Sequence, residues 1–194
     1  MARIEYFFDY VSPYAYLADT QLSALAARTG AEIVYRPFFL GGVMQAAKNT
    51  PPIAVPNKGK YMMADLQRWS RRYGAPINPN PHFPVNTLQA MRAAVAALDD
   101  ARFADFHRAM FRAVWCEGKN LGDAAVLRAQ IDAAGLDGAA ILARAQEQDV
   151  KDALRRNSEE AVERGAFGAP TFFVGDEMFW GNDRLDFLEE ALGE

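Results

Sequence analysis

The chain opens with the stretch RIEYFFDYVSPYAYL, residues 3–17, in which an aromatic run leads through a Ser-Pro pair into helical spacing. Residues 3–9 are short and rich in aromatics, which favours a buried strand, although periodicity alone does not separate such a run from a core helix segment. From Pro13 onward, apolar residues recur every three or four positions, and Gly30 supplies a helix stop. The stretch therefore predicts a strand followed directly by a helix that begins at Ser12-Pro13.

Strand character continues after this helix and then returns only near the end of the chain. Residues 33–40 predict a second strand, so the opening has the strand, helix, strand order of a right-handed crossover unit. Residues 171–174 and 177–180 flank a Gly-Asp turn signal and predict a hairpin. A last helix is expected to begin near residue 183.

The residues between these strands have an almost entirely helical pattern. Gly41-Gly42 and the prolines that follow predict a loop. Residues 78–84, NPNPHFP, predict an extended surface connection, because each proline disfavours helix at its predecessor and lacks an amide donor. Beyond it, glycines separate helices expected at residues 87–98, 101–116, 123–134, 138–147 and 149–164.

This order of elements is coherent only if the helical block is inserted into one sheet-bearing domain. The predicted fold class is α/β, with residues 1–40 and 167–194 forming the sheet domain. Residues 41–166 would form the inserted all-helical domain with its connecting loops. A chain of 194 residues that is 51% hydrophobic can bury a sizeable core.

Composition narrows the classes of function. The net charge of -4 argues against a nucleic-acid partner, and no apolar run approaches the roughly 18 residues that would span a bilayer. We see no secretory signal, and the single cysteine, Cys116, requires no oxidising compartment, so the cytoplasm is the expected location. His82 and His107 lack the spacing of a zinc site, so no metal is expected.

Three short segments contain the candidate site residues. Ser12 before Pro13 is typical of a helix N-cap, but the same hydroxyl can contact an anion drawn to the helix start. Ala169-Pro170 precedes a predicted strand, and we predict that this bond is cis. Asn182 and Asp183 are suited to cap the last helix, and a carboxylate there can also receive a ligand ammonium group.

Three motifs point to one family: FDYVSPYAYL at residues 8–17, Pro51-Pro52 with KGKYM at residues 58–62, and FGAPT at residues 167–171. Together they resemble the 2-hydroxychromene-2-carboxylate isomerase family. That family and the kappa-class glutathione transferases belong to a superfamily typified by the disulfide oxidoreductase DsbA. The resemblance extends over essentially the whole chain, and residues 65–69 and 174–185 favour the isomerase over the transferase.

The resemblance implies a thioredoxin-like sheet with an inserted helical domain, glutathione bound between them, and a homodimer. It implies that Ser12 hydrogen-bonds the glutathione sulfur and that Ala169 pairs with the cysteinyl backbone. The γ-glutamyl end would be held by Asn182 and Asp183, where the kappa transferases tend to have Ser-Asp. The full set of implied glutathione-binding residues is Ser12, Pro13, Tyr14, Asn49, Ala169, Pro170, Asn182 and Asp183.

The activity that the resemblance implies is the interconversion of 2-hydroxychromene-2-carboxylate and trans-o-hydroxybenzylidenepyruvate. The glutathione thiolate would add to an unsaturated carbon, permit bond rotation after ring opening, and leave again, so that glutathione is recycled. The substrate would then be an aromatic carboxylate in a partly apolar cleft. Candidate cleft residues are the walls Trp180, Phe38 and Tyr61 and the carboxylate partners Lys58 and Lys60.

Two other functions remain open at this point. A kappa-type transferase or peroxidase would use the same Ser12 site but consume glutathione, and a redox-inert thioredoxin-like module would only bind a partner. Dithiol oxidoreductase chemistry is disfavoured, because positions 12 and 15 are Ser and Ala rather than the two cysteines of a C-x-x-C site.

Overall fold

The computed structural model describes residues 2–193. Its strands are β1 (Arg3–Phe8), β2 (Glu32–Pro37), β3 (Thr171–Val174) and β4 (Glu177–Trp180). Its helices are α1 (Pro13–Thr29), α2 (Leu40–Ala46), α3 (Pro56–Tyr73), α4 (Leu88–Ala97), α5 (Phe103–Trp115), α6 (Ala124–Ala133), α7 (Gly138–Arg144), α8 (Gln148–Glu163) and α9 (Leu185–Leu192), with 3₁₀ turns η1 (Pro52–Ala54) and η2 (Asn182–Arg184).

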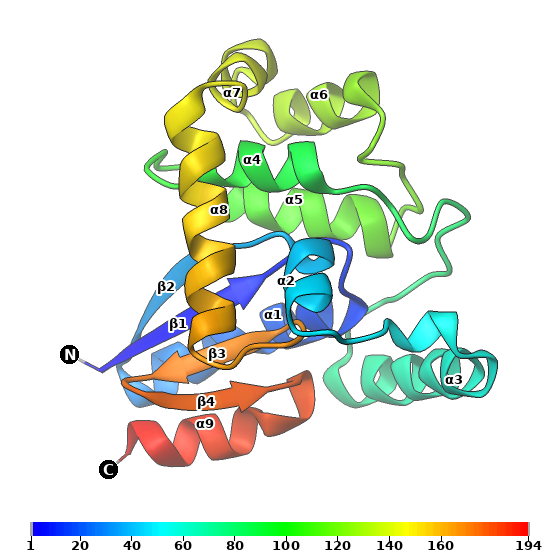
Figure 1. Ribbon diagram of the computed structural model, residues 1–194, viewed down its shortest axis with the longest axis vertical. Coiled ribbons are helices and arrows are strands. Elements are labelled where there is room, and N and C mark those ends of the chain that lie inside the picture. The colour runs from blue at the N-terminus through cyan, green and yellow to red at the C-terminus, as the bar shows by residue number, and fades with distance from the viewer. Residues whose placement is uncertain (1, 194) are drawn as a thin grey trace.

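The four strands form one mixed sheet in the order β2-β1-β3-β4 (Figure 1). β1 pairs in parallel with β2 and antiparallel with β3, so Tyr6 lies opposite both Tyr35 and Phe172. A central strand is covered on both faces, and this explains why β1 is aromatic rather than alternating polar and apolar. The predicted buried strand, the crossover unit and the terminal hairpin are confirmed.

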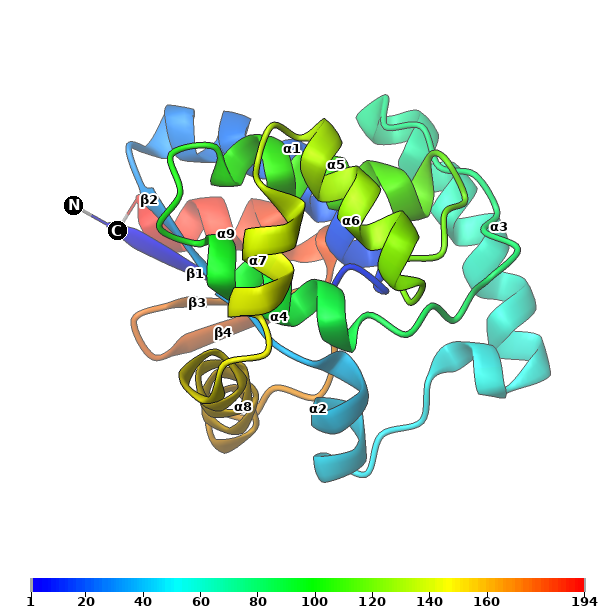
Figure 2. The same cartoon turned by 90° about the horizontal axis from the view of Figure 1, so that it is seen from above.

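Helices cover both faces of the sheet (Figure 2). Tyr6 and Phe8 point into the main core, where α1 and α9 pack. Phe7 points the other way into a smaller apolar cluster with Phe173 and with Ala161 of α8. The sheet is therefore a middle layer between α1 with α9 on one side and α8 on the other.

The helices predicted between residues 87 and 164 are present, with ends within a few residues of those expected. In the described chain this segment contains no strand, and residues 78–84 are not helical. The predicted fold class, a thioredoxin-like sheet with a large helical insertion, is confirmed. Helix α8, in the predicted helical domain 41–166, contacts both α4 of that domain and β2 of the sheet domain, which was predicted as 1–40 with 167–194. The two predicted domains therefore pack directly against each other.

The loop predicted at Gly41-Gly42 is wrong, because residues 40–46 form α2. The backbone N–H of Leu40 donates to the Asp9 carboxylate at 2.9 Å, and that of Phe39 donates to the Ser158 hydroxyl at 3.0 Å. Distant side chains therefore satisfy donors at the helix start that local sequence leaves open. A Cβ on Gly41 would lie 3.2 Å from the Phe39 ring, so the glycine permits close packing rather than marking a loop.

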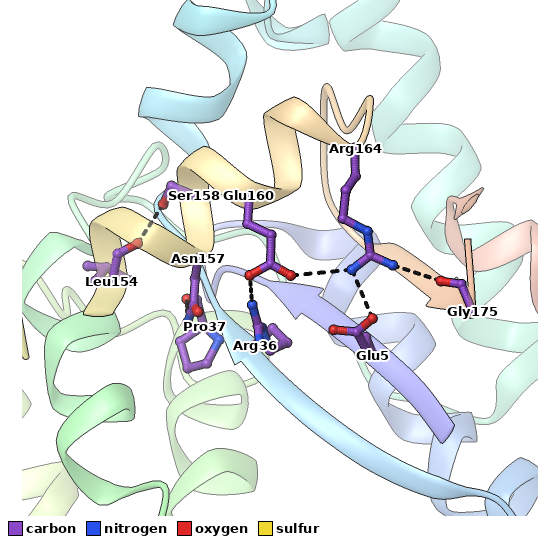
Figure 3. Close-up of polar contacts among 9 residues, drawn as sticks. All are labelled: Glu5, Arg36, Pro37, Leu154, Asn157, Ser158, Glu160, Arg164 and Gly175. Atoms are coloured by element: carbon purple, nitrogen blue, oxygen red, sulfur yellow. Dashed lines mark hydrogen bonds and ion pairs between the residues drawn. The ribbon is translucent and has the colours of Figure 1, made fainter. Parts of the chain in front are cut away.

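A polar cluster fastens α8 to the sheet (Figure 3). Arg164 donates to the Glu5 carboxylate of β1 and to the Gly175 carbonyl of the hairpin turn, both at 2.8 Å. Glu160 accepts from Arg164 at 3.4 Å and also pairs with Arg36 of β2. The Arg164 guanidinium lies 3.7 Å from the centre of the Phe173 ring. One residue thus joins α8, β1 and the hairpin.

None of the described helices is long and apolar enough to cross a membrane.

We predict that Arg164→Met lowers the free energy of unfolding by about 2 kcal/mol, because it removes charge-assisted hydrogen bonds and leaves the Glu5 carboxylate half-buried beside a methyl group. The matched control is Arg108→Met, since Arg108 is exposed and its one ion pair within residues 2–193 is with Asp105, one turn away. That change should shift stability by at most about 0.5 kcal/mol. Urea unfolding measures both, and equal losses would contradict the role assigned to Arg164.

Candidate active site

Ser12 joins the start of α1 to a segment that is remote in the sequence. Its Oγ accepts a hydrogen bond from the Ala15 backbone N–H at 3.1 Å, which confirms the predicted N-cap. The same hydroxyl donates to the Ala169 carbonyl at 3.0 Å. The side chain is buried, and it faces the open amides of the helix start and the segment before β3 at once.

The Ala169-Pro170 peptide bond is cis, as predicted. The segment before it is held by Asn49, whose Nδ2 donates to the Phe167 carbonyl at 2.8 Å. The Trp180 indole covers Gly168 so closely that a Cβ there would lie 2.6 Å from the indole nitrogen. The chain thus brings Ser12, Asn49, Ala169 and Pro170 into one neighbourhood, as the sequence analysis expects.

Pro13 and Tyr14 form the first turn of α1. Pro13 is buried, and the Tyr14 hydroxyl donates to the Asp65 carboxylate of α3 at 3.1 Å. Burial, and then the charge of Asp65, hold the pKa of Tyr14 well above its ordinary value. The hydroxyl therefore stays protonated at neutral pH and ties α3 to the helix start.

Asn182 and Asp183 lie in η2, which packs against α1. The expectation that one of them caps the last helix is wrong, since the N-cap of α9 is Arg184 and no side chain makes a cap bond. Gly181, with φ of 106°, turns the chain into a 3₁₀ turn first. The Tyr73 hydroxyl donates to the Asn182 carbonyl at 2.7 Å, which anchors this turn on α3.

The two side chains of this turn differ in exposure. Asn182 is 2% exposed, and its amide nitrogen is buried without a hydrogen-bond acceptor in the described chain. The Asp183 side chain is 43% exposed and lies 3.6 Å from Arg184. Buried amides are rarely left unpaired, so the Asn182 nitrogen is a candidate donor to a ligand.

Sequence reasoning missed Asp9, which it placed at the end of the predicted strand 3–9 without assigning it a role. Its side chain is fully buried and accepts hydrogen bonds from Val11 N–H at 3.0 Å, Leu40 N–H at 2.9 Å and the Thr87 hydroxyl at 2.6 Å. Its backbone carbonyl accepts from Ser12 N–H at 3.0 Å. Burial raises the pKa of this carboxyl. An acidic residue directly after three consecutive aromatic residues was the available signal.

Some of the other candidates are not brought to the site. Phe38 is fully buried in the cluster beneath α8, so its assignment as a cleft wall is wrong. Trp180 and Tyr61 are exposed, whereas Lys58 and Lys60 lie on the first turns of α3. His82 is exposed and His107 is buried between Tyr10 and Asp19, and no metal-binding cluster occurs among residues 2–193.

Comparison with known proteins places this geometry in a family. The DSBA-like thioredoxin domain model matches residues 3–193. The 2-hydroxychromene-2-carboxylate isomerase of Sphingobium xenophagum is 38% identical over 97% of both chains. The chain belongs to the 2-hydroxychromene-2-carboxylate isomerase family.

A solved structure supports the same assignment. The selenomethionine form of a 2-hydroxychromene-2-carboxylate isomerase superposes with a TM-score of 0.89 at 32% identity, covering 98% of this chain and 94% of the other. A more distant relative is glutathione S-transferase kappa 1 of Caenorhabditis elegans, 27% identical over 99% of this chain and 91% of that protein. The resemblance stated from the sequence motifs is confirmed, with the isomerases more similar than the transferase.

We predict that Asp9→Asn destabilises the fold by about 1–3 kcal/mol, because the new NH₂ group must face a backbone N–H of Val11 or Leu40. The pH dependence has a defined sign. Burial raises the folded-state pKa above the ordinary 3.8, so protonation favours the folded state. The carboxyl's contribution is complete below 3.8 and declines as the pH rises through the raised pKa.

The stability difference between wild type and Asp9→Asn should therefore shrink with rising pH across that window. Chemical denaturation at a series of pH values from about 3.8 upward measures it. A difference that grows with pH would mean that the folded protein lowers this pKa and would overturn the assignment.

Proposed function

We propose that this protein is a glutathione-dependent isomerase that interconverts 2-hydroxychromene-2-carboxylate and trans-o-hydroxybenzylidenepyruvate. The observation that carries the proposal is the Ser12 hydroxyl, capped into the start of α1 and bonded to Ala169 beside a cis proline. The family relatives named isomerases and, more distantly, glutathione S-transferases support this choice of cofactor and reaction. In this chain a serine stands where redox relatives have a cysteine.

The Ser12 hydroxyl has one proton and therefore one donor partner at a time. Without a ligand that partner is the Ala169 carbonyl. A thiolate placed at the helix start would accept the hydrogen bond from the Ser12 hydroxyl in place of the Ala169 carbonyl. That carbonyl would then be free to accept a hydrogen bond from the cysteinyl N–H of glutathione. The Ala15 N–H keeps donating to Ser12 Oγ throughout, so the side chain holds its position while the donor bond exchanges.

The remaining residues fit the other end of glutathione. The unpaired Asn182 amide nitrogen can donate to the γ-glutamyl carboxylate, and the exposed Asp183 carboxylate can accept from its ammonium group. Asn49 donates to the carbonyl of Phe167, two residues before Ala169 in the chain. Donors and acceptors of this chain thus match both the anionic and the cationic groups of the tripeptide.

The energies involved are sufficient to favour the thiolate. A free thiol has a pKa of about 8.5, and each unit of depression requires about 1.4 kcal/mol. A helix N-terminus contributes roughly 0.3–1 kcal/mol, and a hydrogen bond to a charged group roughly 1.5–3 kcal/mol. Ser12 and the first turn of α1 together can therefore lower the thiol pKa below neutrality.

When bound, glutathione supplies a thiolate that adds reversibly to an unsaturated carbon and is returned at the end of the reaction. The task of this chain is to hold that sulfur and its backbone in place. Ser12 donates to the sulfur, Ala169 orients the cysteinyl unit, and Asp9 keeps the Ser12 segment in register. No residue of the chain needs to change its oxidation state.

Ser12→Ala should raise the pKa of the bound thiol by about one to two units, through loss of the charge-assisted hydrogen bond, and lower turnover near neutral pH accordingly. The measurement is thiolate absorbance and rate against pH at saturating glutathione. Asp123→Ala is the matched control, because Asp123 is also an N-cap but lies on α6. It should cost about 1 kcal/mol of stability and leave the titration unchanged. If the bound thiol titrates at the same pH in Ser12→Ala as in wild type, Ser12 serves only as the N-cap of α1.

Asn182→Leu should weaken glutathione binding by about tenfold or more, because it removes a donor to a charged carboxylate. The melting temperature should not fall, since the buried amide nitrogen has no partner to lose within the described chain. Calorimetric titration with glutathione and thermal unfolding test the two halves. Unaltered affinity would contradict the proposed γ-glutamyl contact.

The same proposal includes a cytoplasmic homodimer that acts on an aromatic carboxylate. Sedimentation velocity tests the dimer. An assay of isomerase activity with and without glutathione distinguishes the alternatives: a kappa-type transferase would consume glutathione in proportion to product, and an inert thioredoxin-like module would show no turnover at all.

A further inference from the structure

A cavity lies away from the residues proposed to bind glutathione. It has a volume of about 670 Å³, opens to the surface between α2, α4 and α8, and has none of those residues in its lining. Much of its wall is apolar, formed by Phe39, Val43, Ala46, Leu88, Leu154 and Val162. A cavity of this size and character is typical of a small-molecule site.

Arg92 enters this cavity from α4, one turn after Leu88. Its Nε is buried and has no hydrogen-bond acceptor, and its guanidinium makes no ion pair with any of residues 2–193. A buried guanidinium nitrogen without an acceptor is costly, since proteins pair nearly all such groups. Arg92 is therefore a cation at the cavity wall whose buried Nε finds no acceptor among residues 2–193.

The other charges of the lining are unevenly placed. Arg155 is occupied by Asp152 at 3.1 Å, whereas Lys151, one turn before it, has no ion pair within the described residues. Glu159 and Glu163 lie further along α8 and are exposed. Arg92 and Lys151, neither of them in an ion pair within residues 2–193, thus line a cavity whose wall is largely apolar and also carries Asp152, Glu159 and Glu163.

We propose that this cavity binds a small organic carboxylate with an apolar or aromatic body, its carboxylate on Arg92 and Lys151 and its body against Phe39, Val43 and Leu88. The planar guanidinium fork matches a carboxylate, and the apolar wall matches the body. A phosphate dianion fits less well, because three acidic side chains line the same cavity. This site is separate from the Ser12 site, because none of Ser12, Asn49, Ala169 and Pro170 lines the cavity.

The probe is 2-naphthoate, titrated into the full-length ¹⁵N-labelled protein, with uncharged 2-naphthalenemethanol as its comparison. We expect saturable shifts of the Val43, Leu88 and Val162 amides with naphthoate, and binding at least about tenfold weaker with the alcohol. Three results would overturn the proposal: no saturation at millimolar naphthoate, equal binding of the alcohol, or shifts confined to the amides around Ser12 and Gly168.

Arg92→Met should weaken naphthoate binding at least about tenfold and should not lower the melting temperature, because Arg92 makes no polar contact within the described chain. Arg155→Met is the matched control, since Arg155 lines the cavity but is paired with Asp152. The naphthoate affinity of this variant should stay within about twofold of the wild-type affinity. If Arg92→Met does not fold, Lys151→Met replaces it, with the same expected loss of naphthoate affinity.

Two outcomes would overturn the assignment. One is wild-type naphthoate affinity in a folded Arg92→Met variant, or in the Lys151→Met variant that replaces it. The other is dissociation of a dimer on Arg92→Met, which would mean that a second copy of the chain fills the cavity.

Discussion

The arrangement of the candidate active site depends on one buried carboxylate, that of Asp9 directly after the central strand. A buried carboxylate is tolerated only when donors surround it, and here the donors come from the turn before α1, the start of α2 and the residue that precedes α4. Each donor fixes one element relative to β1. The turn that carries Ser12 and the helices that flank it are thereby held by a single group, and loss of any donor would leave the carboxylate partly unpaired.

The site built on this anchor is a set of single hydrogen bonds between segments far apart in the chain. Ser12 bonds to Ala169, Asn49 to Phe167, Tyr14 to Asp65, and Tyr73 to Asn182. Three of these bonds tether backbone or helices and need not change during turnover. The Ser12 bond is different, because its proton is the one that a bound thiolate would attract. A rigid frame around one exchangeable donor is what electrostatic stabilisation of a thiolate requires.

Three buried side-chain nitrogens have no acceptor in the described chain, and their surroundings give them different meanings. The Nε of Arg36 belongs to a guanidinium that already pairs with Glu160 and packs over Phe7, so the cluster that fastens α8 to the sheet accounts for its position. Asn182 lies beside the proposed glutathione site, and Arg92 lies in a cavity of its own. The first is a local imperfection in a stabilising network, whereas Arg92 lines a cavity and Asn182 is the donor that the proposed function assigns to glutathione.

The sequence by itself determined the elements and their order, because helix periodicity, aromatic strands and Gly or Pro punctuation act over a few residues. It also located Ser12, Ala169 and Pro170, because they lie in short motifs that carry the resemblance to the isomerase family. Only the tertiary structure decided that Gly41-Gly42 begins a helix, that Phe38 is core, that η2 precedes α9, and that Asp9 is an anchor. Each of these features depends on a partner about thirty or more residues away or on packing against another element. A long-range hydrogen bond or buried contact produces no periodic pattern in the residues that make it, so the local sequence does not reveal it.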